Sequence, residues 1–263
     1  MKLGIEWNSK DTISIEEQAA LIRENGFDAT MVGLEEERLG EIMTALRRHD
    51  IACEHYHAPF NGINSMWEAG DAGERMLERL CDCVRAGATY GVPVVVVHLS
   101  SGMTPPRMND IGFERYDRLM QLAEREGVTI AYENIRRLDN VVYMLENYPK
   151  AGFCWDVGHE ACYMNGVELM PLFGKRMAAL HLHDNTAVYD EDKHWLPFTG
   201  VVDMERAARH FANSPYRGSV MLEVRKNNVG EECSRRFYEM AYAAAKRFAD
   251  LVDAFRADQK GTK

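Results

Sequence analysis

Short runs of hydrophobic residues alternate along the chain with longer segments that are hydrophobic on one side only. Eight of the short runs are rich in Val, Ile, Leu or aromatic residues and have the length of buried strands. They cover residues 2–7, 29–34, 51–57, 92–99, 128–135, 151–156, 177–184 and 219–224. The longer segments predict helices, most clearly over 14–25, 74–91, 112–127, 138–149 and 230–255. We expect the tail, residues 257–263, to be frayed.

This alternation predicts a single α/β domain, residues 1–263, folded as a (β/α)8 barrel. An open, doubly wound sheet is the main alternative, and its nucleotide-binding form carries a glycine-rich phosphate loop after the first strand. The first predicted strand is followed here by "EWNSKDTIS", which is not such a loop. The pattern therefore favours the barrel.

Titratable residues gather where the predicted strands end. Six of the nine histidines lie at or just after a strand end: His55, His57, His98, His159, His181 and His183. Acidic residues occupy equivalent positions at Glu133, Asp156 and Glu223. The carboxyl ends of all strands meet at one face of a barrel, and that face carries the active site. We therefore expect these side chains to form a ring around the barrel mouth.

The residue types in this ring indicate a metal site. Glu133, Asp156, His181 and Glu223 follow four successive strands. Three carboxylates that converge without a cation repel one another and force protonation, and a divalent cation removes that cost. A mostly oxygen donor set suits Mn²⁺, Mg²⁺ or Co²⁺ and can also hold Zn²⁺. The alternative is that each carboxylate caps a helix or pairs with an arginine.

Charge and composition limit the kinds of partner that the protein is expected to bind. The formal net charge is −10, which argues against nucleic acid and anionic membranes. The N-terminus has no long apolar segment typical of a signal peptide, and no run approaches the length of a membrane span. The six cysteines form no C-x-x-C pair, as expected for free thiols in a cytoplasmic protein.

Five motifs carry a family resemblance over nearly the whole chain. They are "HAPF" (57–60), "AYENI" (131–135), "CWDVGH" (154–159), "HLHD" (181–184) and "MLEV" (221–224). With these motifs the chain resembles the xylose isomerase-like TIM barrels, the superfamily of sugar phosphate isomerases and epimerases and of endonuclease IV (AP endonuclease family 2). The segment "DKHWLPFTGVVD" (192–203) also resembles a loop of the family, but it has Phe198 where that pattern has Gly.

The resemblance implies that Glu133, Asp156, His181 and Glu223 bind one divalent cation, with Asp184 marking His181 as the ligand. It implies an isomerase or epimerase acting on a sugar, a sugar phosphate or a related keto compound through a metal-stabilised enediolate. Glu133 and Glu223 would move the proton, and His159 would contact a substrate oxygen or a second metal. Protonation on the opposite face gives an epimer, and protonation on the neighbouring carbon gives an aldose–ketose isomer.

Two other functions remain open within this resemblance. An endonuclease IV-like enzyme would hold three metals and cleave abasic DNA, and His57, His98, His159, Asp192 and His194 could supply its additional ligands. The segment "GLEEERLGE" (33–41) argues against it, because phosphate binding favours Lys and Arg. The other possibility is a non-catalytic sugar-binding barrel, against which the complete carboxylate set argues.

The substrate pocket is predicted from residues near the strand ends. Aromatic side chains can stack on a sugar, and a positively charged side chain two residues after Glu223 could bind a phosphate or carboxylate group. The predicted substrate-binding residues are His57, His98, His159, Trp7, Phe60, Trp67 and Arg225. The alternative for each aromatic residue is that it packs a loop against the barrel rim. The resemblance also leaves a homo-oligomer open.

Overall fold

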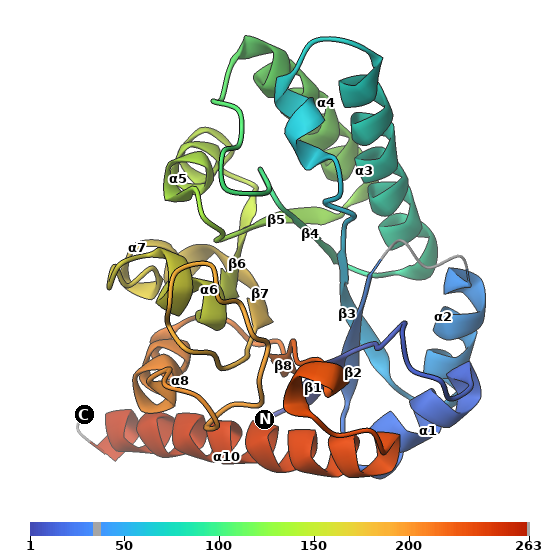
Figure 1. Ribbon diagram of the computed structural model, residues 1–263, viewed down its shortest axis with the longest axis vertical. Helices are drawn as coiled ribbons and strands as arrows, with labels where there is room; N and C mark the ends of the chain where they lie inside the picture. The colour runs from blue at the N-terminus through green and yellow to red at the C-terminus, as the bar shows by residue number, and fades with distance from the viewer. Residues whose placement is uncertain (34–37, 262–263) are drawn as a thin grey trace.

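Eight parallel strands form a closed barrel (Figure 1). The computed structural model describes residues 1–33 and 38–261. Its strands are β1 (Leu3–Glu6), β2 (Ala29–Gly33), β3 (Ala52–His57), β4 (Val94–Val97), β5 (Thr129–Glu133), β6 (Gly152–Asp156), β7 (Met177–His181) and β8 (Val220–Leu222). Each lies within one of the eight predicted segments, which confirms the predicted fold. The last residue of predicted segment 29–34 lies outside the described residues.

The strands follow one another around the ring in chain order, and β8 pairs with β1. The ring closes between β7 and β8, where the Leu182 amide donates to the Met221 carbonyl at 2.9 Å and the Glu223 amide donates to the Leu182 carbonyl at 3.2 Å. The register shifts at two places, once between β2 and β3 and once between β6 and β7. Such irregularities re-aim the residues that follow them. After the shifts, His55 pairs with Met31, and His181 pairs with Asp156.

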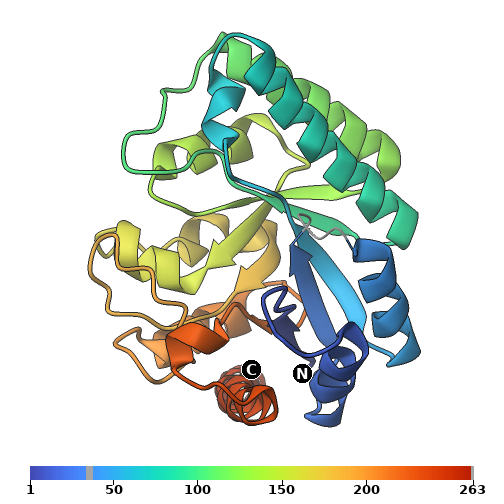
Figure 2. The same cartoon turned by 45° about the vertical axis from the view of Figure 1, so that its right-hand side comes forward.

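Helices surround the strands and provide the return connections (Figure 2). The α-helices are α1 (Ile15–Glu24), α2 (Leu39–Arg48), α3 (Asp71–Tyr90), α4 (Asp110–Glu126), α5 (Leu138–Asn147), α6 (Val157–Tyr163), α7 (Met170–Phe173), α8 (Met204–Asn213), α9 (Lys226–Val229) and α10 (Ser234–Gly261). Short 3-10 helices are η1 (Ile63–Trp67) and η2 (Gly174–Arg176). The five predicted helices correspond to α1, α3, α4, α5 and α10.

The core has two parts because barrel strands are covered on both faces. The larger part lies between the strands and the helices and includes Ile5, Tyr56 and Trp155. The smaller part fills the barrel interior with two clusters, Val96, Ala131, Cys154 and Ala179 in one and Ala29, Met31 and Met221 in the other. The barrel interior is therefore packed, largely with apolar side chains.

Helix α10 runs beside the N-terminus, where the Met1 amine lies 3.9 Å from an Asp253 carboxylate oxygen. It continues to Gly261, so residues 257–261, which we expected to be frayed, are helical. A hydrogen bond from the Gln259 amide to Asn213 of α8 ties this end down. Residues 262–263 lie outside the described part.

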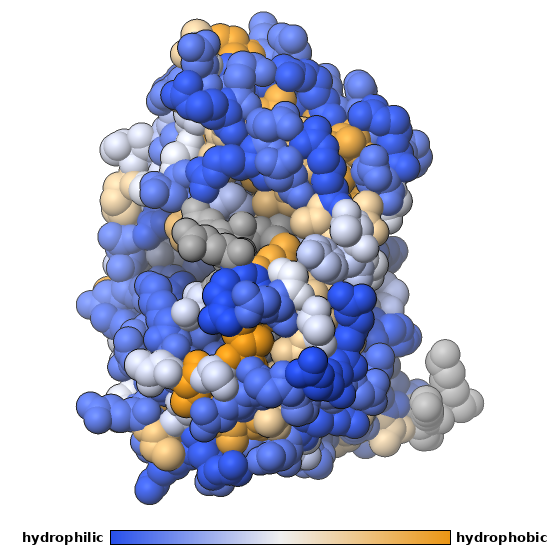
Figure 3. Space-filling model, turned by 90° about the vertical axis from the view of Figure 1, so that its right-hand side faces the viewer, coloured by the Kyte–Doolittle hydropathy of each residue, from blue (hydrophilic) through white to orange (hydrophobic). Residues whose placement is uncertain are grey.

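The face drawn in Figure 3 is mostly polar, with only small hydrophobic patches on it. This agrees with the net charge of −10. Among the residues that the structure describes, no helix is long and apolar enough to cross a membrane.

Candidate active site

The inner face of the barrel changes from apolar to titratable at the carboxyl ends of the strands. Successive residues of a strand point to opposite faces, so the residues two positions after the interior clusters share their face. Glu6 and His57 belong to the same face, because they pair with Met31 and Val96. The inner positions at the mouth are Glu6, Gly33, His57, His98, Glu133, Asp156, His181 and Glu223. Seven of the eight strands thus place a titratable side chain there.

The central group is the predicted metal-binding set. Glu133, Asp156, His181 and Glu223 are all buried, and each offers a ligand atom within 4.8 Å of the others. The Nδ1 of His181 lies 3.3 Å from a carboxylate oxygen of Glu133 and 3.3 Å from one of Glu223. It lies 3.9 Å from Oδ2 of Asp156.

Among the residues that the structure describes, three buried atoms of this group have no hydrogen-bond partner: Glu133 Oε1, His181 Nδ1 and Glu223 Oε2. Buried polar atoms are normally paired, so three unpaired atoms that face one another need an explanation. A divalent cation coordinated by all of them provides one, and three carboxylates with one imidazole form a suitable donor set. The four residues therefore fit a metal.

Asp156 combines two roles. Its Oδ1 accepts a hydrogen bond from the backbone amide of His159 at 2.6 Å and caps helix α6. Its Oδ2 remains directed to the centre, 3.5 Å from Nδ1 of His159. The sequence offered helix capping and metal binding as alternatives for this carboxylate, and the geometry provides an oxygen for each.

Two histidines face Glu133 from the other side. Nε2 of His57 and Nε2 of His98 lie 3.2 and 2.9 Å from Glu133 Oε2. The Nδ1 of His57 lies 2.9 Å from the carbonyl oxygen of Ala58, so it is this nitrogen that donates a proton. The ring of Phe60, which is 44% exposed, stacks on His98 with ring centroids 4.6 Å apart. These three residues, which we predict to bind substrate, lie together at the mouth.

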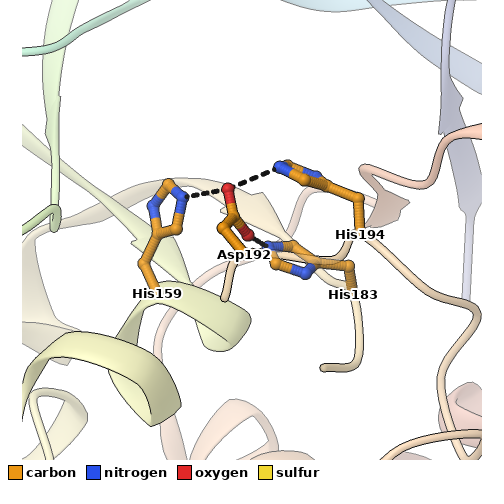
Figure 4. Close-up of side chains that lie close together, drawn as sticks. All are labelled: His159, His183, Asp192 and His194. Carbon is orange, nitrogen blue, oxygen red and sulfur yellow. Dashed lines mark hydrogen bonds and ion pairs between the residues drawn. The ribbon is translucent and has the colours of Figure 1, made fainter. Parts of the chain in front are cut away.

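A second cluster lies beside the centre and consists of His159, His183, Asp192 and His194 (Figure 4). Asp192 Oδ2 is 3.2 Å from Nε2 of His159 and 2.9 Å from Nε2 of His194. Nε2 of His183 lies 3.7 Å from the other oxygen of Asp192 and 3.1 Å from Asp156. The structure thus brings Asp192 and His194 together with His159, as expected of an additional metal site.

The tautomers in this second cluster also suit a cation. Nδ1 of His194 lies 2.9 Å from the carbonyl oxygen of Glu223 and donates to it. Burial, followed by the nearby His183, lowers the pKa of His194 to about 4. The neutral ring then points an unprotonated Nε2 at a carboxylate, and only a proton or a metal ion can bind between two such acceptors. Asp192 Oδ1 is a buried atom without a hydrogen-bond partner.

Asp184 holds the loop that carries Asp192 and His194. Its carboxylate is fully buried and accepts hydrogen bonds from the backbone amides of Asn185 at 2.8 Å, Gly200 at 2.9 Å and Val202 at 3.0 Å. Its backbone pairs with that of Trp195 through two 2.9 Å hydrogen bonds. Asp184 therefore positions the site without facing it.

The carboxyl groups of the centre differ in acidity. Burial alone would raise the pKa of Glu133, but His181, His98 and His159 outweigh burial and hold this pKa well below 4.5. Burial, followed by the neighbouring carboxylates of Glu133 and Glu6, raises the pKa of Glu223 well above 4.5. The site thus contains one carboxyl that stays ionised and one that readily holds a proton.

Three predicted pocket residues have different positions. Trp7 and Trp67 are 4% and 2% exposed and belong to the hydrophobic layer under the helices, so their assignment to the pocket was wrong. The Trp67 indole donates to the Leu99 carbonyl at 2.6 Å and its ring packs against Tyr116. Arg225 is exposed and lies near the mouth, where its charge offsets part of the rise that burial causes in the pKa values of Glu6 and Glu223.

The sequence analysis missed Glu6 and placed His183 in the ring around the mouth without making it a ligand. Glu6, at the end of β1, is partly buried, and burial raises its pKa above 4.5. The signal was its position before Trp7 in predicted strand 2–7, since only one of the two can face the barrel interior. His183 is fully buried against α6, where a Cβ on Gly158 would lie 2.0 Å from its ring.

The fold is a TIM barrel whose mouth carries a buried group of carboxylates and histidines. A family profile for the xylose isomerase-like TIM barrel matches residues 19–253, and the chain belongs to this family. No curated protein matches the sequence.

Several solved structures are similar. The 3-keto-D-glucoside 4-epimerase YcjR from E. coli is 19% identical with a TM-score of 0.75, and the match covers 94% of this chain and 99% of that one. A D-tagatose 3-epimerase-like protein is 20% identical with a TM-score of 0.77 and coverage of 97% and 99%. The IOLI protein with a bound zinc atom is 18% identical with a TM-score of 0.75, again covering 97% and 99%. At these identities the likeness demonstrates the fold.

Proposed function

We propose that this chain is a divalent-metal-dependent sugar isomerase or epimerase that moves a proton next to the carbonyl group of a keto sugar. The observation that carries the proposal is the pair Glu133 and Glu223. They come from β5 and β8 and face the same nitrogen of His181, each at 3.3 Å, within a buried metal-binding set. Family membership and the similarity to structures named as sugar epimerases support it.

The metal would be held by Glu133, Asp156, His181 and Glu223. A divalent cation in this set supplies Lewis-acid polarisation of a carbonyl oxygen and so acidifies the neighbouring C–H group. The oxygen-rich donors suit Mn²⁺, Mg²⁺ or Co²⁺, and the set also accepts Zn²⁺, the ion in the similar IOLI structure.

The protein groups would then transfer the proton. One of the two glutamates removes it from the carbon, and the other returns a proton from its own side of the substrate. Return to the opposite face of the same carbon gives an epimer, and return to the neighbouring carbon gives an aldose. His159, whose Nδ1 lies 3.1 Å from Glu133, is placed to orient a substrate oxygen, and Phe60 offers an exposed aromatic face to the sugar.

Solvent exchange tests this proposal. The Mn²⁺- or Co²⁺-loaded protein is incubated in D₂O with a panel of ketoses and keto-glycosides, and NMR detects deuterium at the carbon next to the carbonyl. We expect deuterium incorporation with at least one member of the panel, and its loss in Glu133→Gln and Glu223→Gln. Glu160→Gln is the matched control, because this buried carboxylate binds the Trp155 indole and the Leu169 amide instead. Incorporation that persists in Glu223→Gln would contradict the proposal.

A second candidate, a multi-metal phosphodiesterase, is favoured by one observation. Besides the central group, four further sets have ligand atoms within 4.8 Å of one another. Two of them extend the site to either side: one is His57, His98 and Glu133, and the other is His159, His183, Asp192 and His194. Adjacent metals of this kind stabilise both oxygens of a phosphoryl displacement. Two or three zinc ions per chain, together with cleavage of an abasic-site DNA duplex, would favour this function over proton transfer.

A further inference from the structure

One buried histidine beside the centre has no part in the proposed proton transfer. His55 lies on the inner face of β3, one layer below His57, and is 1% exposed. Its Nε2 lies 3.2 Å from Nε2 of His181. The two rings are nearly parallel, with centroids 5.3 Å apart and an angle of 28°. Two imidazole nitrogens therefore face each other at hydrogen-bond distance inside the barrel.

The atom by which His181 faces the carboxylates determines its tautomer. Its Nδ1 is directed to Glu133 and Glu223, and a metal bound there requires this nitrogen to be unprotonated. A neutral imidazole then carries its proton on Nε2 and needs an acceptor for it. In the described part of the chain, His55 Nε2 is the one hydrogen-bond partner of that atom.

Within residues 1–33 and 38–261, the nearest neighbours of His55 offer no good substitute as acceptor. The cluster next to it is apolar and consists of Ala29, Met31 and Met221. The sulfur of Met31, which lies 3.1 Å from His55 Nε2, is a weak acceptor. The register shift between β2 and β3 sets His55 opposite Met31 on the inner face. Without this shift His55 would point to the helices, since a slip of one residue reverses the face.

We propose that His55 is a positioning residue that accepts the Nε2–H hydrogen bond of His181 and so fixes the tautomer and ring orientation in which His181 Nδ1 binds the metal. Ligating histidines usually donate their second N–H to a carboxylate, a backbone carbonyl or water. Here a second imidazole would accept this hydrogen bond, so no further negative charge is needed in the barrel interior. The inference rests on the proposed function in assuming that the central group binds a metal.

The test measures metal affinity rather than turnover. Metal-free wild type, His55→Leu, His55→Gln and Met31→Leu are titrated with Zn²⁺ and Co²⁺ against a chelating indicator. Loss of an outer partner of a ligand typically costs about 10–100-fold in metal affinity. We expect His55→Leu to lose affinity within this range and His55→Gln, whose amide oxygen can accept the same bond, to recover most of it. Met31→Leu, which changes packing around His55 but leaves the imidazole pair intact, is expected to bind as wild type.

A spectroscopic readout supports the titration and does not depend on any variant folding. In the zinc-loaded wild type, long-range ¹H–¹⁵N NMR is expected to show His181 protonated at Nε2. Protonation at Nδ1, or unchanged affinity in His55→Leu, would overturn the role of His55. Absence of Zn²⁺ and Co²⁺ binding in the wild type would instead overturn the proposed function itself.

Discussion

Replacing Glu223 by Gln is expected to stabilise the metal-free protein while abolishing its stabilisation by metal. The change keeps the side-chain volume and removes a negative charge that faces two other buried carboxylates, Glu133 and Asp156. Two unit charges about 5 Å apart at an effective dielectric constant of about 20 repel by about 3 kcal/mol. His181, which is 3.3 Å away, offsets part of this repulsion. We therefore expect the free energy of unfolding to rise by about 1–2 kcal/mol.

The pH dependence of this effect has a defined sign. Burial and the neighbouring carboxylates raise the pKa of Glu223 in the folded protein above its unfolded value of 4.5. Below that pH, Glu223 is protonated in both the folded and the unfolded protein and does not lower the free energy of unfolding. As the pH rises above it, the folded protein must either hold the charge against its neighbours or take up a proton, and stability is lost. The advantage of Glu223→Gln should therefore grow above about pH 4.5.

Urea unfolding between pH 4 and pH 8 with a chelator present measures the free energy of unfolding of the metal-free proteins. The same experiment with Mn²⁺ measures how much the metal stabilises each of them. Ligand at about 100 times its Kd stabilises the wild type by about 2.7 kcal/mol, and the variant should lose this gain. Asp184→Asn is the matched control, because its carboxylate accepts three backbone hydrogen bonds. It should lose about 1.5–3 kcal/mol in both conditions. The reasoning is refuted if Glu223→Gln destabilises the metal-free protein as Asp184→Asn does.

Three further predictions concern other parts of the chain. Asp11→Asn should lower the free energy of unfolding at neutral pH and have a smaller effect in acid. Burial alone would raise the Asp11 pKa, but hydrogen bonds from Lys226 and Ser234 lower it below 3.8, so the stabilisation is lost as the pH falls below that value. Acid titration of both proteins, followed by circular dichroism, measures this difference. Gly112→Ala should cost about 3 kcal/mol or more in urea unfolding, because the new Cβ would lie 1.9 Å from the Trp67 ring. Phe60→Ala should raise KM for the sugar and leave stability within about 0.5 kcal/mol, since Phe60 is 44% exposed.

The fold could be predicted because its strands are short, continuous hydrophobic runs that fit burial on both faces. Helix ends were also readable: α3 and α4 stop at Gly91 and Gly127, whose φ angles of 73° and 70° favour glycine. Helices α2 and α8 were not among the segments we named. Their lengths of ten residues do not explain this, because α1 and α5 are equally long and were predicted.

The centre of the site could be predicted because equivalent strand ends must meet in a barrel, which brings Glu133, Asp156, His181 and Glu223 together. The roles of Trp7 and Glu6 could not be predicted, because both faces of a barrel strand are covered and alternation alone does not show which face is the inner one. The position of Trp67 could not be predicted for another reason. Its packing depends on Gly112 and Tyr116, about 45 residues away in the chain, and no local pattern reports such a contact.

The number of metal ions per chain shows whether the buried carboxylate–histidine group holds one metal, as we propose. The wild type and Glu223→Gln are purified without chelator, and metal per chain is measured by mass spectrometry before and after loading with Mn²⁺. We expect one divalent ion per chain in the wild type and its loss in the variant. A wild type that binds no metal even after loading, or a variant that keeps its ion, would contradict it.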